Sequence, residues 1–280
     1  MSLSRRSFLA SAGAALATAA AANRFDGFHI GVTDWNLQQT GKLEAVTLAK
    51  SLGFDGVQIS LGRKPVDNKL PLDNAGIQAQ YLAKSRREGI PLDGTCLDIL
   101  HVNYLKNDKL GQKWVADGIG ITQKLGARVM LLPFFGKGAL ATRAEMDHVG
   151  DALKELAPEA EKAQVILGLE DTISAEDNVR IMDRAQSKAA LVYYDVGNST
   201  GAGFDVVKEI RWLGGQRICQ IHLKDNPHYL GEGKIDFKAV LQAIADIQFK
   251  GFANLETSAP SKSVEQDMRR NLQYIRALMG

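Results

Sequence analysis

The sequence predicts an α/β protein built as a single (β/α)8 barrel, and three observations support this fold class. Eight short apolar runs alternate with stretches of helical periodicity from residue 28 to the end of the chain. No Gly-Ser linker or break in composition interrupts this alternation, which favours one parallel sheet in one domain. Leaving out residues 1–22, the 280-residue chain comes close to the roughly 250 residues of such a barrel.

Residues 1–22 are interpreted as a twin-arginine signal peptide. Arg5 and Arg6 are followed by Ser7-Phe8-Leu9 and by a weakly apolar run through Ala22. A charged start, an apolar middle and small residues before a cleavage point are typical of exported bacterial precursors. We therefore expect the twin-arginine export machinery to deliver the folded chain to the periplasm or cell envelope. The alternative is an uncleaved anchor or a basic N-terminal tail, and the sequence leaves cleavage open.

The barrel domain is expected over residues 23–280, with each strand formed by an apolar run of about five to eight residues. Strands are expected at 28–33, 54–60, 92–97, 127–132, 164–169, 190–194, 217–223 and 250–255. Apolar residues at helical spacing, such as Leu153, Leu156 and Ala160, predict the intervening helices. These are expected at 41–52, 74–89, 109–125, 142–163, 175–187, 203–213, 236–247 and 261–278. The long connections follow strands, which places them at the mouth where barrel enzymes keep their chemistry.

Charge and cysteine content exclude several classes of function. Beyond residue 22 the chain has 32 basic and 32 acidic residues, because Arg5 and Arg6 are the only charges in the leader. This balance gives no electrostatic case for binding nucleic acid or an anionic membrane. Cys96 and Cys219 fall on the third and seventh predicted strands, so we expect buried thiols rather than a disulfide.

Four consecutive strands of the second half each end in a residue that binds divalent metals. These residues are Glu170, Asp195, His222 and Glu256, separated by 25 to 34 residues, enough for one helix to return the chain to a parallel neighbour. Parallel strands would bring all four side chains to one end of the barrel. Carboxylates with one imidazole suit Mn²⁺, Mg²⁺, Co²⁺ or Zn²⁺ better than a thiolate-loving metal. One divalent ion is therefore expected, and Mn²⁺ is preferred.

Motifs at these strand ends resemble the xylose isomerase-like barrel superfamily, on its sugar phosphate isomerase/epimerase branch. They are Leu169-Glu170-Asp171-Thr172, Tyr194-Asp195-Val196-Gly197-Asn198, Ile221-His222-Leu223-Lys224-Asp225, Gly231-Glu232-Gly233-Lys234 and Leu255-Glu256-Thr257. Similarity to ketose 3-epimerases implies that the four strand-end residues hold the metal and that Glu170 and Glu256 also transfer protons. Asn198 stands where those epimerases commonly carry a His, and it is expected to contact the substrate. The DNA-repair endonucleases of the superfamily need more His and Asp ligands than this chain offers with five His.

Such a site is expected to act as a sugar isomerase or epimerase. A metal that chelates a carbonyl and its neighbouring hydroxyl stabilises an enediolate, and two Glu on opposite faces can exchange the adjacent proton. The same first step followed by loss of a leaving group would give a lyase or dehydratase acting on a keto-sugar or 3-keto-glycoside. An exported barrel that only binds sugar is an alternative of another class. The native metal, the substrate and pairing into a homodimer stay open.

Further candidates for contacting a sugar substrate lie in the mouth loops. Trp35 and His101 follow the first and third strands, where a ring stacks on a sugar face or an imidazole shuttles a proton. Lys224 and Asp225 follow the His222 ligand and could orient its imidazole or bind a hydroxyl. His228 lies in the loop expected to cover the site. For each of these residues, an ordinary loop or barrel-top role is the competing interpretation.

Overall fold

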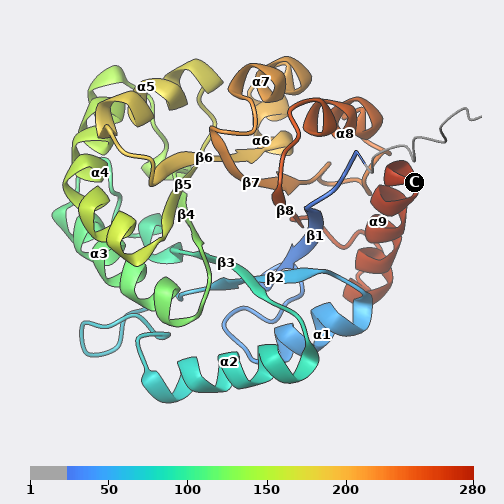
Figure 1. Ribbon diagram of the computed structural model, residues 1–280, viewed down its shortest axis with the longest axis horizontal. Helices are drawn as coiled ribbons and strands as arrows, with labels where there is room; N and C mark the ends of the chain where they lie inside the picture. Colours follow the sequence, from blue (N-terminus) through green and yellow to red (C-terminus); the bar gives the residue numbers. More distant parts are fainter. Residues whose placement is uncertain (1–23) are drawn as a thin grey trace, which may run out of the picture.

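Eight parallel strands follow one another in chain order around a closed barrel in a computed structural model, which describes residues 24–280. β1 pairs in parallel with both β2 and β8, and this closes the sheet. Figure 1 shows the helices as an outer ring around the strands. The predicted (β/α)8 barrel is confirmed. The predicted signal peptide lies outside the described residues.

Each strand falls within about two residues of a predicted apolar run. The strands are buried on both faces, as in β7, where all six residues are buried. Their bounds are β1 (Phe28–Thr33), β2 (Gly56–Ser60), β3 (Leu92–Cys96), β4 (Val129–Pro133), β5 (Ile166–Glu170), β6 (Ala190–Asp195), β7 (Ile218–Leu223) and β8 (Gly251–Leu255).

The helices that cover the barrel include short ones that the sequence did not predict. The longer helices are α1 (Glu44–Leu52), α2 (Ala75–Glu88), α3 (Lys109–Lys124), α4 (Arg143–Ala163), α5 (Ala175–Ala185), α7 (Val206–Leu213), α8 (Phe237–Asp246) and α9 (Val264–Met279). The short ones are α6 (Val196–Gly201) and the 3-10 helices η1 (Asp98–His101) and η2 (Gly136–Gly138). The helix predicted at 203–213 is therefore shorter, and a separate α6 precedes it directly after β6.

Local caps explain where several helices begin and end. Thr142 and Glu145 form a capping box at the start of α4, in which each side chain bonds the other residue's backbone N–H. The Asp195 side chain accepts the N–H of Asn198 and so starts α6 immediately after the strand. Gly53 ends α1 in the left-handed region at φ 93°, as glycine readily does. The caps at Thr142 and Asp195 lie at helix starts on the mouth side of the barrel, whereas Gly53 lies in a helix-to-strand turn at the opposite end.

The barrel interior is polar at alternate strand positions, whereas the outward faces pack against the helices. His222 Nε2 lies 3.0 Å from Gln58 Oε1, which also accepts a 3.1 Å bond from the Tyr193 hydroxyl. The Asn254 amide donates to the Tyr193 oxygen at 3.0 Å and to the Asp93 carboxyl at 3.2 Å. We call Gln58, Tyr193, Asn254 and Asp93 the floor network. It pairs most of its buried polar groups, whereas Asp93 Oδ2 and Asn254 Oδ1 have no hydrogen-bond partner among the described residues.

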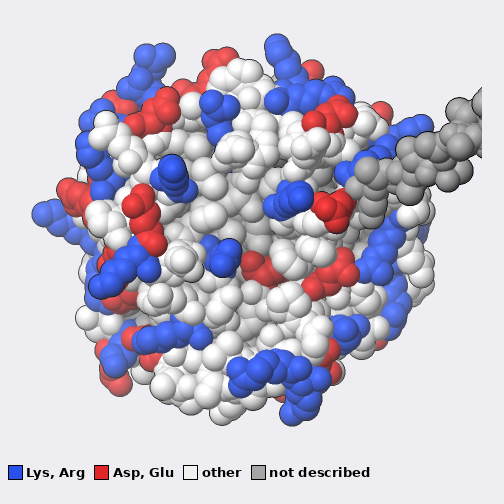
Figure 2. Space-filling model, viewed as in Figure 1, with Lys and Arg blue, Asp and Glu red and all other residues white. Residues whose placement is uncertain are grey.

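Two remaining features concern sulfur and membranes. Cys96 and Cys219 are buried and not bonded to each other, and burial raises the pKa of both thiols. Within residues 24–280, no helix combines the length and the apolar character needed to cross a membrane. On the face shown in Figure 2, basic and acidic side chains are interspersed, and no continuous basic surface appears.

Candidate active site

The four strand-end residues converge at one end of the barrel. Glu170 and Asp195 are the last residues of β5 and β6, His222 is in β7, and Glu256 directly follows β8. One ligand atom from each residue lies within 4.8 Å of the others. We call these four residues the metal group. The register of the parallel strands brings them together, because β6 places Asp195 beside His222.

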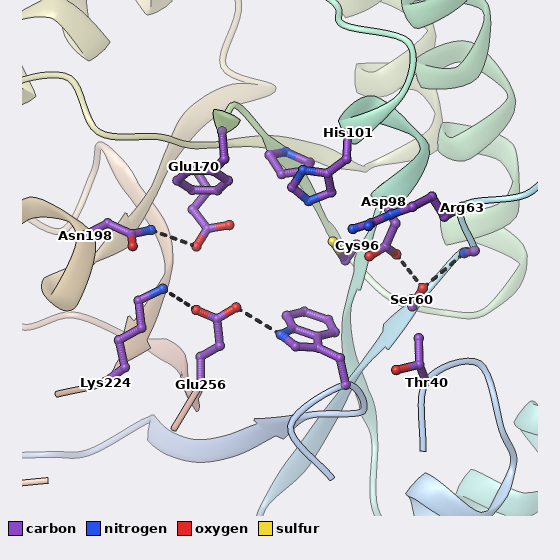
Figure 3. Close-up of a pocket in the computed structure, with 14 residues that line it drawn as sticks. Thr40, Ser60, Arg63, Cys96, Asp98, His101, Glu170, Asn198, Lys224 and Glu256 are labelled. Carbon is purple, nitrogen blue, oxygen red and sulfur yellow. Dashed lines mark hydrogen bonds and ion pairs between the residues drawn. The ribbon is translucent and has the colours of Figure 1, made fainter. Parts of the chain in front are cut away.

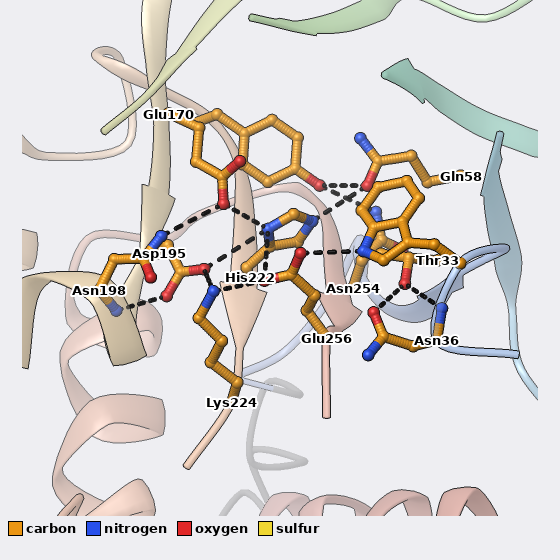
Figure 4. A network of polar contacts seen from close by, with 12 residues as sticks. Thr33, Asn36, Gln58, Glu170, Asp195, Asn198, His222, Lys224, Asn254 and Glu256 are labelled. Atoms are coloured by element: carbon orange, nitrogen blue, oxygen red, sulfur yellow. Dashed lines mark hydrogen bonds and ion pairs between the residues drawn. The ribbon is translucent and has the colours of Figure 1, made fainter. Parts of the chain in front are cut away.

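His222 lies at the centre of the metal group, as Figure 4 shows. Its Nδ1 is 2.9 Å from Glu170 Oε1, 3.5 Å from Asp195 Oδ2 and 3.6 Å from Glu256 Oε2. The opposite ring nitrogen, Nε2, faces Gln58 Oε1 of the floor network. This oxygen already accepts the Tyr193 hydroxyl. A hydrogen on Nε2 therefore suits Gln58, and leaves the Nδ1 lone pair directed at the carboxylates.

Burial and crowding perturb the acids and bases of the metal group. Burial raises the pKa of Glu170 to about 7, although His222 opposes the shift. Burial opposes protonation of His222, but Glu256, Glu170 and Asp195 outweigh it and raise its pKa to about 10. Burial likewise opposes ionisation of Asp195, yet Lys224 and His222 outweigh it and lower the pKa of that carboxyl. Two buried carboxylates and the partly buried Glu256 thus favour a positive charge among them.

Lys224 supplies part of that positive charge. Its Nζ lies 2.7 Å from Asp195 Oδ2 and forms a second ion pair with Glu256 Oε2. Burial opposes the charged form, but Asp195 and Glu256 raise the pKa of Lys224 above its usual range. Gly197 makes room for this side chain, because a Cβ there would lie 2.4 Å from Lys224 Cγ. The glycine of the Asp-Val-Gly motif at the end of β6 therefore also leaves space for Lys224, which directly follows β7.

The residues of the metal group fit a divalent ion. Three carboxylates and the imidazole Nδ1 form a mixed oxygen and nitrogen donor set, in which a cation would replace the proton that His222 otherwise takes. Gln58 supports the imidazole from behind and Asn198 donates to Glu170 Oε1 at 3.5 Å. Metal-binding histidines commonly have such a partner on the second nitrogen.

A cavity of about 520 Å³ opens above the metal group. Glu170 and Glu256 both line it, and Figure 3 shows their carboxylates directed into it. Its size lies within the range of about 300–1,000 Å³ typical of small-molecule sites. Trp35 joins the wall, and its indole Nε1 donates to Glu256 Oε1 at 2.9 Å. This contact fixes one oxygen of Glu256, while Lys224 holds the other.

The other predicted substrate contacts divide into two groups. Trp35, His101, Asn198 and Lys224 all line the cavity. Asp225 does not, because it is buried beneath the loop before α8 and accepts the backbone N–H groups of Gly233 at 2.9 Å and Lys234 at 3.2 Å. His228 is exposed in the same loop and is not part of the cavity wall.

Several residues of the site did not emerge from the sequence. They are Gln58 in the floor network, and Ser60, Arg63 and Asp98 in the cavity wall. A signal for two of them exists, because Gln58 and Ser60 alternate with Val57 and Ile59 along β2. Polar residues at every second position of a buried barrel strand point inward. Asp98 has no comparable signal, since it lies in a short 3-10 helix after β3.

Comparisons with known proteins place these features among sugar-converting barrels. The sequence profile described as "Xylose isomerase-like TIM barrel" matches residues 46–278. The 2-epi-5-epi-valiolone 7-phosphate 2-epimerase of an Actinoplanes species is 24% identical over 203 residues, covering 71% of this chain and 73% of that protein. The putative L-ribulose-5-phosphate 3-epimerase SgbU of Escherichia coli is 26% identical over 236 residues, covering 74% and 80%.

Solved structures show the same fold. A D-psicose 3-epimerase from Clostridium cellulolyticum, solved with D-tagatose, superposes with a TM-score of 0.73 at 16% identity. The match covers 90% of this chain and 99% of that one. The homologues found by sequence are thus sugar epimerases, and nothing in these comparisons supports the lyase alternative.

Proposed function

The chain belongs to the xylose isomerase-like TIM barrel family, and on this premise we propose that it is a divalent-metal-dependent sugar epimerase acting beside the carbonyl of a ketose. One observation carries the proposal. Glu170 and Glu256 belong to the metal group and also line the cavity, so two carboxylates from different strands face the same bound molecule. The epimerase names of the sequence relatives support the same reaction class.

The metal, when bound by Glu170, Asp195, His222 and Glu256, would polarise the carbonyl and make the neighbouring C–H acidic. The chain's own residues then move the proton. Glu170 is suited to take or give it, because its carboxylate lines the cavity. Glu256 is held by Trp35 and Lys224 and is the second candidate, serving the other face of the substrate. Removal on one face and return on the other inverts one stereocentre.

Proton exchange with solvent tests this function directly. The purified protein, loaded with Mn²⁺ and in parallel with Mg²⁺, Co²⁺ and Zn²⁺, is incubated with a panel of ketopentoses and ketohexoses in D₂O. Proton NMR should show deuterium at the carbon beside the carbonyl together with the epimer. A protein that binds a sugar, yet exchanges no proton with any metal, would be the non-catalytic barrel instead. An unsaturated or cleaved product would establish a lyase.

Single amide replacements separate the two glutamates. Glu170→Gln and Glu256→Gln should each lower turnover by about 10²–10⁴-fold, because the amide keeps the shape but cannot act as a base. The double variant should be little worse than the poorer single one, since the pair acts as a unit. Glu161→Gln changes the same group on α4, where Glu161 only accepts the Ser187 hydroxyl, and should leave turnover unchanged. Near-normal turnover in both active-site variants would remove the two-base assignment.

A further inference from the structure

The cavity has a second polar end, which the proposed reaction does not use. The metal group occupies one end, whereas Ser60, Asp98, His101 and Arg63 line the other. Figure 3 shows these side chains across the cavity from Glu170 and Glu256. We call Ser60, Asp98 and His101 the distal group. Ser60 ends β2, whereas Asp98 and His101 belong to η1 after β3, so none of these residues lies on β5 to β8.

Hydrogen bonds within the distal group fix Asp98 and leave it one free acceptor. The Ser60 hydroxyl donates to Asp98 Oδ2, and itself accepts the Gly62 N–H at 3.1 Å. Asp98 Oδ1 accepts no hydrogen bond from the described residues, although the side chain lines the cavity. Below Ser60, the buried Asp34 carboxylate accepts the backbone N–H groups of Ser60 at 3.1 Å and Gly41 at 2.8 Å. The bonds of Ser60 to Asp98 and Asp34 therefore hold Asp98 Oδ1 in place.

Flat rings line the cavity at the distal end and beside the metal group. The His101 imidazole stacks on the Phe135 ring with centroids 6.3 Å apart and an interplanar angle of 26°. Trp35, fixed by its bond to Glu256, lines the same space. Rings of this kind pack on the C–H faces of sugars, while a carboxylate oxygen accepts their hydroxyl protons. The wall between the ends suits a polyhydroxylated carbon chain or ring.

The charges at the distal end do not suit a phosphate. Two cations, Arg63 and Lys224, line the cavity, and Lys224 is already paired with Asp195 and Glu256. Arg63 is exposed and makes no ion pair or side-chain hydrogen bond within residues 24–280, and its charge acts on the nearby Asp98 and His101. Phosphate sites usually gather several cationic or N–H donors. Here a phosphate would meet the Asp98 carboxylate and one exposed guanidinium.

We propose that the distal group is a hydroxyl-binding subsite that selects a neutral, non-phosphorylated sugar, with Asp98 Oδ1 accepting a hydroxyl proton far from the reacting carbonyl. The inference rests on the proposed function for the position of the carbonyl. It sets this chain apart from the two sequence relatives described above, whose names specify sugar phosphates. The substrate class is a free ketose or a keto-sugar bearing a further neutral, hydroxylated group.

Three probes measure the subsite. The first is the free ketose that exchanges best in the D₂O screen or, if none exchanges, the one that binds best. The second is the same ketose phosphorylated at its terminal carbon. The third is dihydroxyacetone, which is too short to reach both ends of the cavity. Binding to the metal-loaded protein is followed by NMR titration, and exchange by deuterium incorporation. Wild type should bind the free ketose at least about tenfold more tightly than the phosphorylated ketose. A hydroxyl can donate a hydrogen bond to Asp98 Oδ1, whereas a phosphate cannot.

Variants of the distal group give the second measurement. Asp98→Asn and Ser60→Ala should each weaken binding of the free ketose by about tenfold or more, and affect dihydroxyacetone by a clearly smaller factor. Asp67→Asn removes a carboxylate from an exposed position of the loop after β2, where it makes no side-chain hydrogen bond, and should behave as wild type. Because two variants are measured, a folding defect in one of them does not decide the result.

The outcomes separate the two proposals. Ketose binding that falls in Asp98→Asn and Ser60→Ala, without deuterium exchange by any protein, would support the subsite and overturn the epimerase function. Unchanged ketose affinity in both variants, with exchange intact in wild type, would overturn the subsite and leave the function standing. Tighter binding of the phosphorylated ketose, lost in Arg63→Ala, would also overturn the subsite and identify Arg63 as a phosphate contact.

Discussion

At the scale of single residues, Gln58 decides how the central imidazole faces the carboxylates. Its Oε1 receives both the Tyr193 hydroxyl and the Nε2 side of His222, and it lies fully buried. An amide oxygen in this position can only accept, so it favours the tautomer with the proton on Nε2. The Nδ1 lone pair then points at Glu170, Asp195 and Glu256 without rearrangement. Gln58 is accordingly a positioning residue rather than a ligand.

Replacing Gln58 should therefore weaken metal binding. Wild type should hold about one divalent ion per chain, whereas Gln58→Leu should lower the affinity by about 10–100-fold, because the imidazole loses its partner. Competition with a chelating dye measures the affinity, and elemental analysis measures the stoichiometry.

Gln220→Leu is the matched control for this test. Gln220 is equally buried on β7, but its amide donates to the Asp93 backbone oxygen and does not touch His222. Its replacement should cost stability and leave metal affinity near wild type. Equal losses of metal affinity in the two variants would show that Gln58 acts through packing alone.

The four residues of the metal group could be predicted from the sequence to lie together, but the residues that contact them could not. Each member of the metal group ends an apolar run, and this local signal survives without knowledge of the fold. Gln58 and Asp98 gain their roles from partners far away in the chain, such as His222 at a separation of 164 residues. Only closure of the barrel brings such pairs together.

At the scale of elements, the loop between β7 and α8 shows why its glycines are needed. The Asp225 carboxylate holds the backbone N–H groups of Gly233 and Lys234. A Cβ on Gly233 would lie 2.2 Å from Asp225 Oδ1, too close for any side chain. Gly231 adopts φ +82°, and a Cβ there would lie 2.2 Å from the Tyr274 hydroxyl oxygen. The Gly-x-Gly pattern is thus a requirement of loop geometry.

Adding a methyl group at Gly233 should destabilise this loop. Gly233→Ala should reduce the unfolding free energy by about 1–3 kcal/mol, the usual cost of overpacking, because the carboxylate must move away from its two N–H donors. Gly120→Ala is the opposite case, since nothing lies within 4 Å of its Cβ inside α3. That change should stabilise the chain by about 0.5–1 kcal/mol. Urea denaturation of both variants checks the predicted difference in sign.

Element boundaries were predicted best where the chain's own caps define them. The capping box of Thr142 and Glu145 marks the start of α4, and the prediction of 142–163 agrees with the observed Arg143–Ala163. The separate α6 was missed because its cap is Asp195, whose carboxylate also belongs to the metal group. Asp195 both caps α6 and belongs to the metal group, but the sequence pattern indicated only its place in the metal group. The predicted helix at 203–213 therefore included part of the non-helical segment that separates α6 from α7.

At the scale of the whole molecule, Asp34 links stability to pH. Burial raises its pKa from the ordinary 3.8 to about 7, although the N–H groups of Gly41 and Ser60 oppose the shift. The folded chain therefore keeps a proton that the unfolded chain loses, between these two pH values. Because the native state binds more protons there, the contribution of Asp34 to the unfolding free energy falls as pH rises through that window.

Asp34→Asn should remove this dependence. The unfolding free energy of the variant minus that of wild type should rise by up to about 1.4 kcal/mol for each pH unit between about pH 5 and 7. The reason is that the Asn amide does not titrate, whereas the Asp34 carboxyl does. Urea denaturation curves of both proteins at several pH values measure the difference. Asp67→Asn controls for the loss of a negative charge. A constant difference between Asp34→Asn and wild type would mean that Asp34 is ionised in the folded chain throughout.

We propose that residues 1–22 direct export of the chain. Replacing Arg5 and Arg6 together by Lys should leave the protein in the cytoplasm, because the twin-arginine pathway reads the paired guanidinium groups as an address. Cell fractionation with an immunoblot measures the distribution. The control is the unaltered precursor in the same cells. Periplasmic protein at normal levels in the double variant would refute the targeting proposal.

The origin of the two cavity ends in different parts of the chain has a consequence for how such a protein diversifies. The metal group lies on β5 to β7 and directly after β8, whereas the distal group lies at the end of β2 and in η1 after β3. Recombination that exchanged the first half of the gene would therefore replace the distal group and keep the metal group. Gln58 and Trp35 tie that half to the metal group, through His222 and Glu256, so an incoming half-barrel must match the resident one at these two positions.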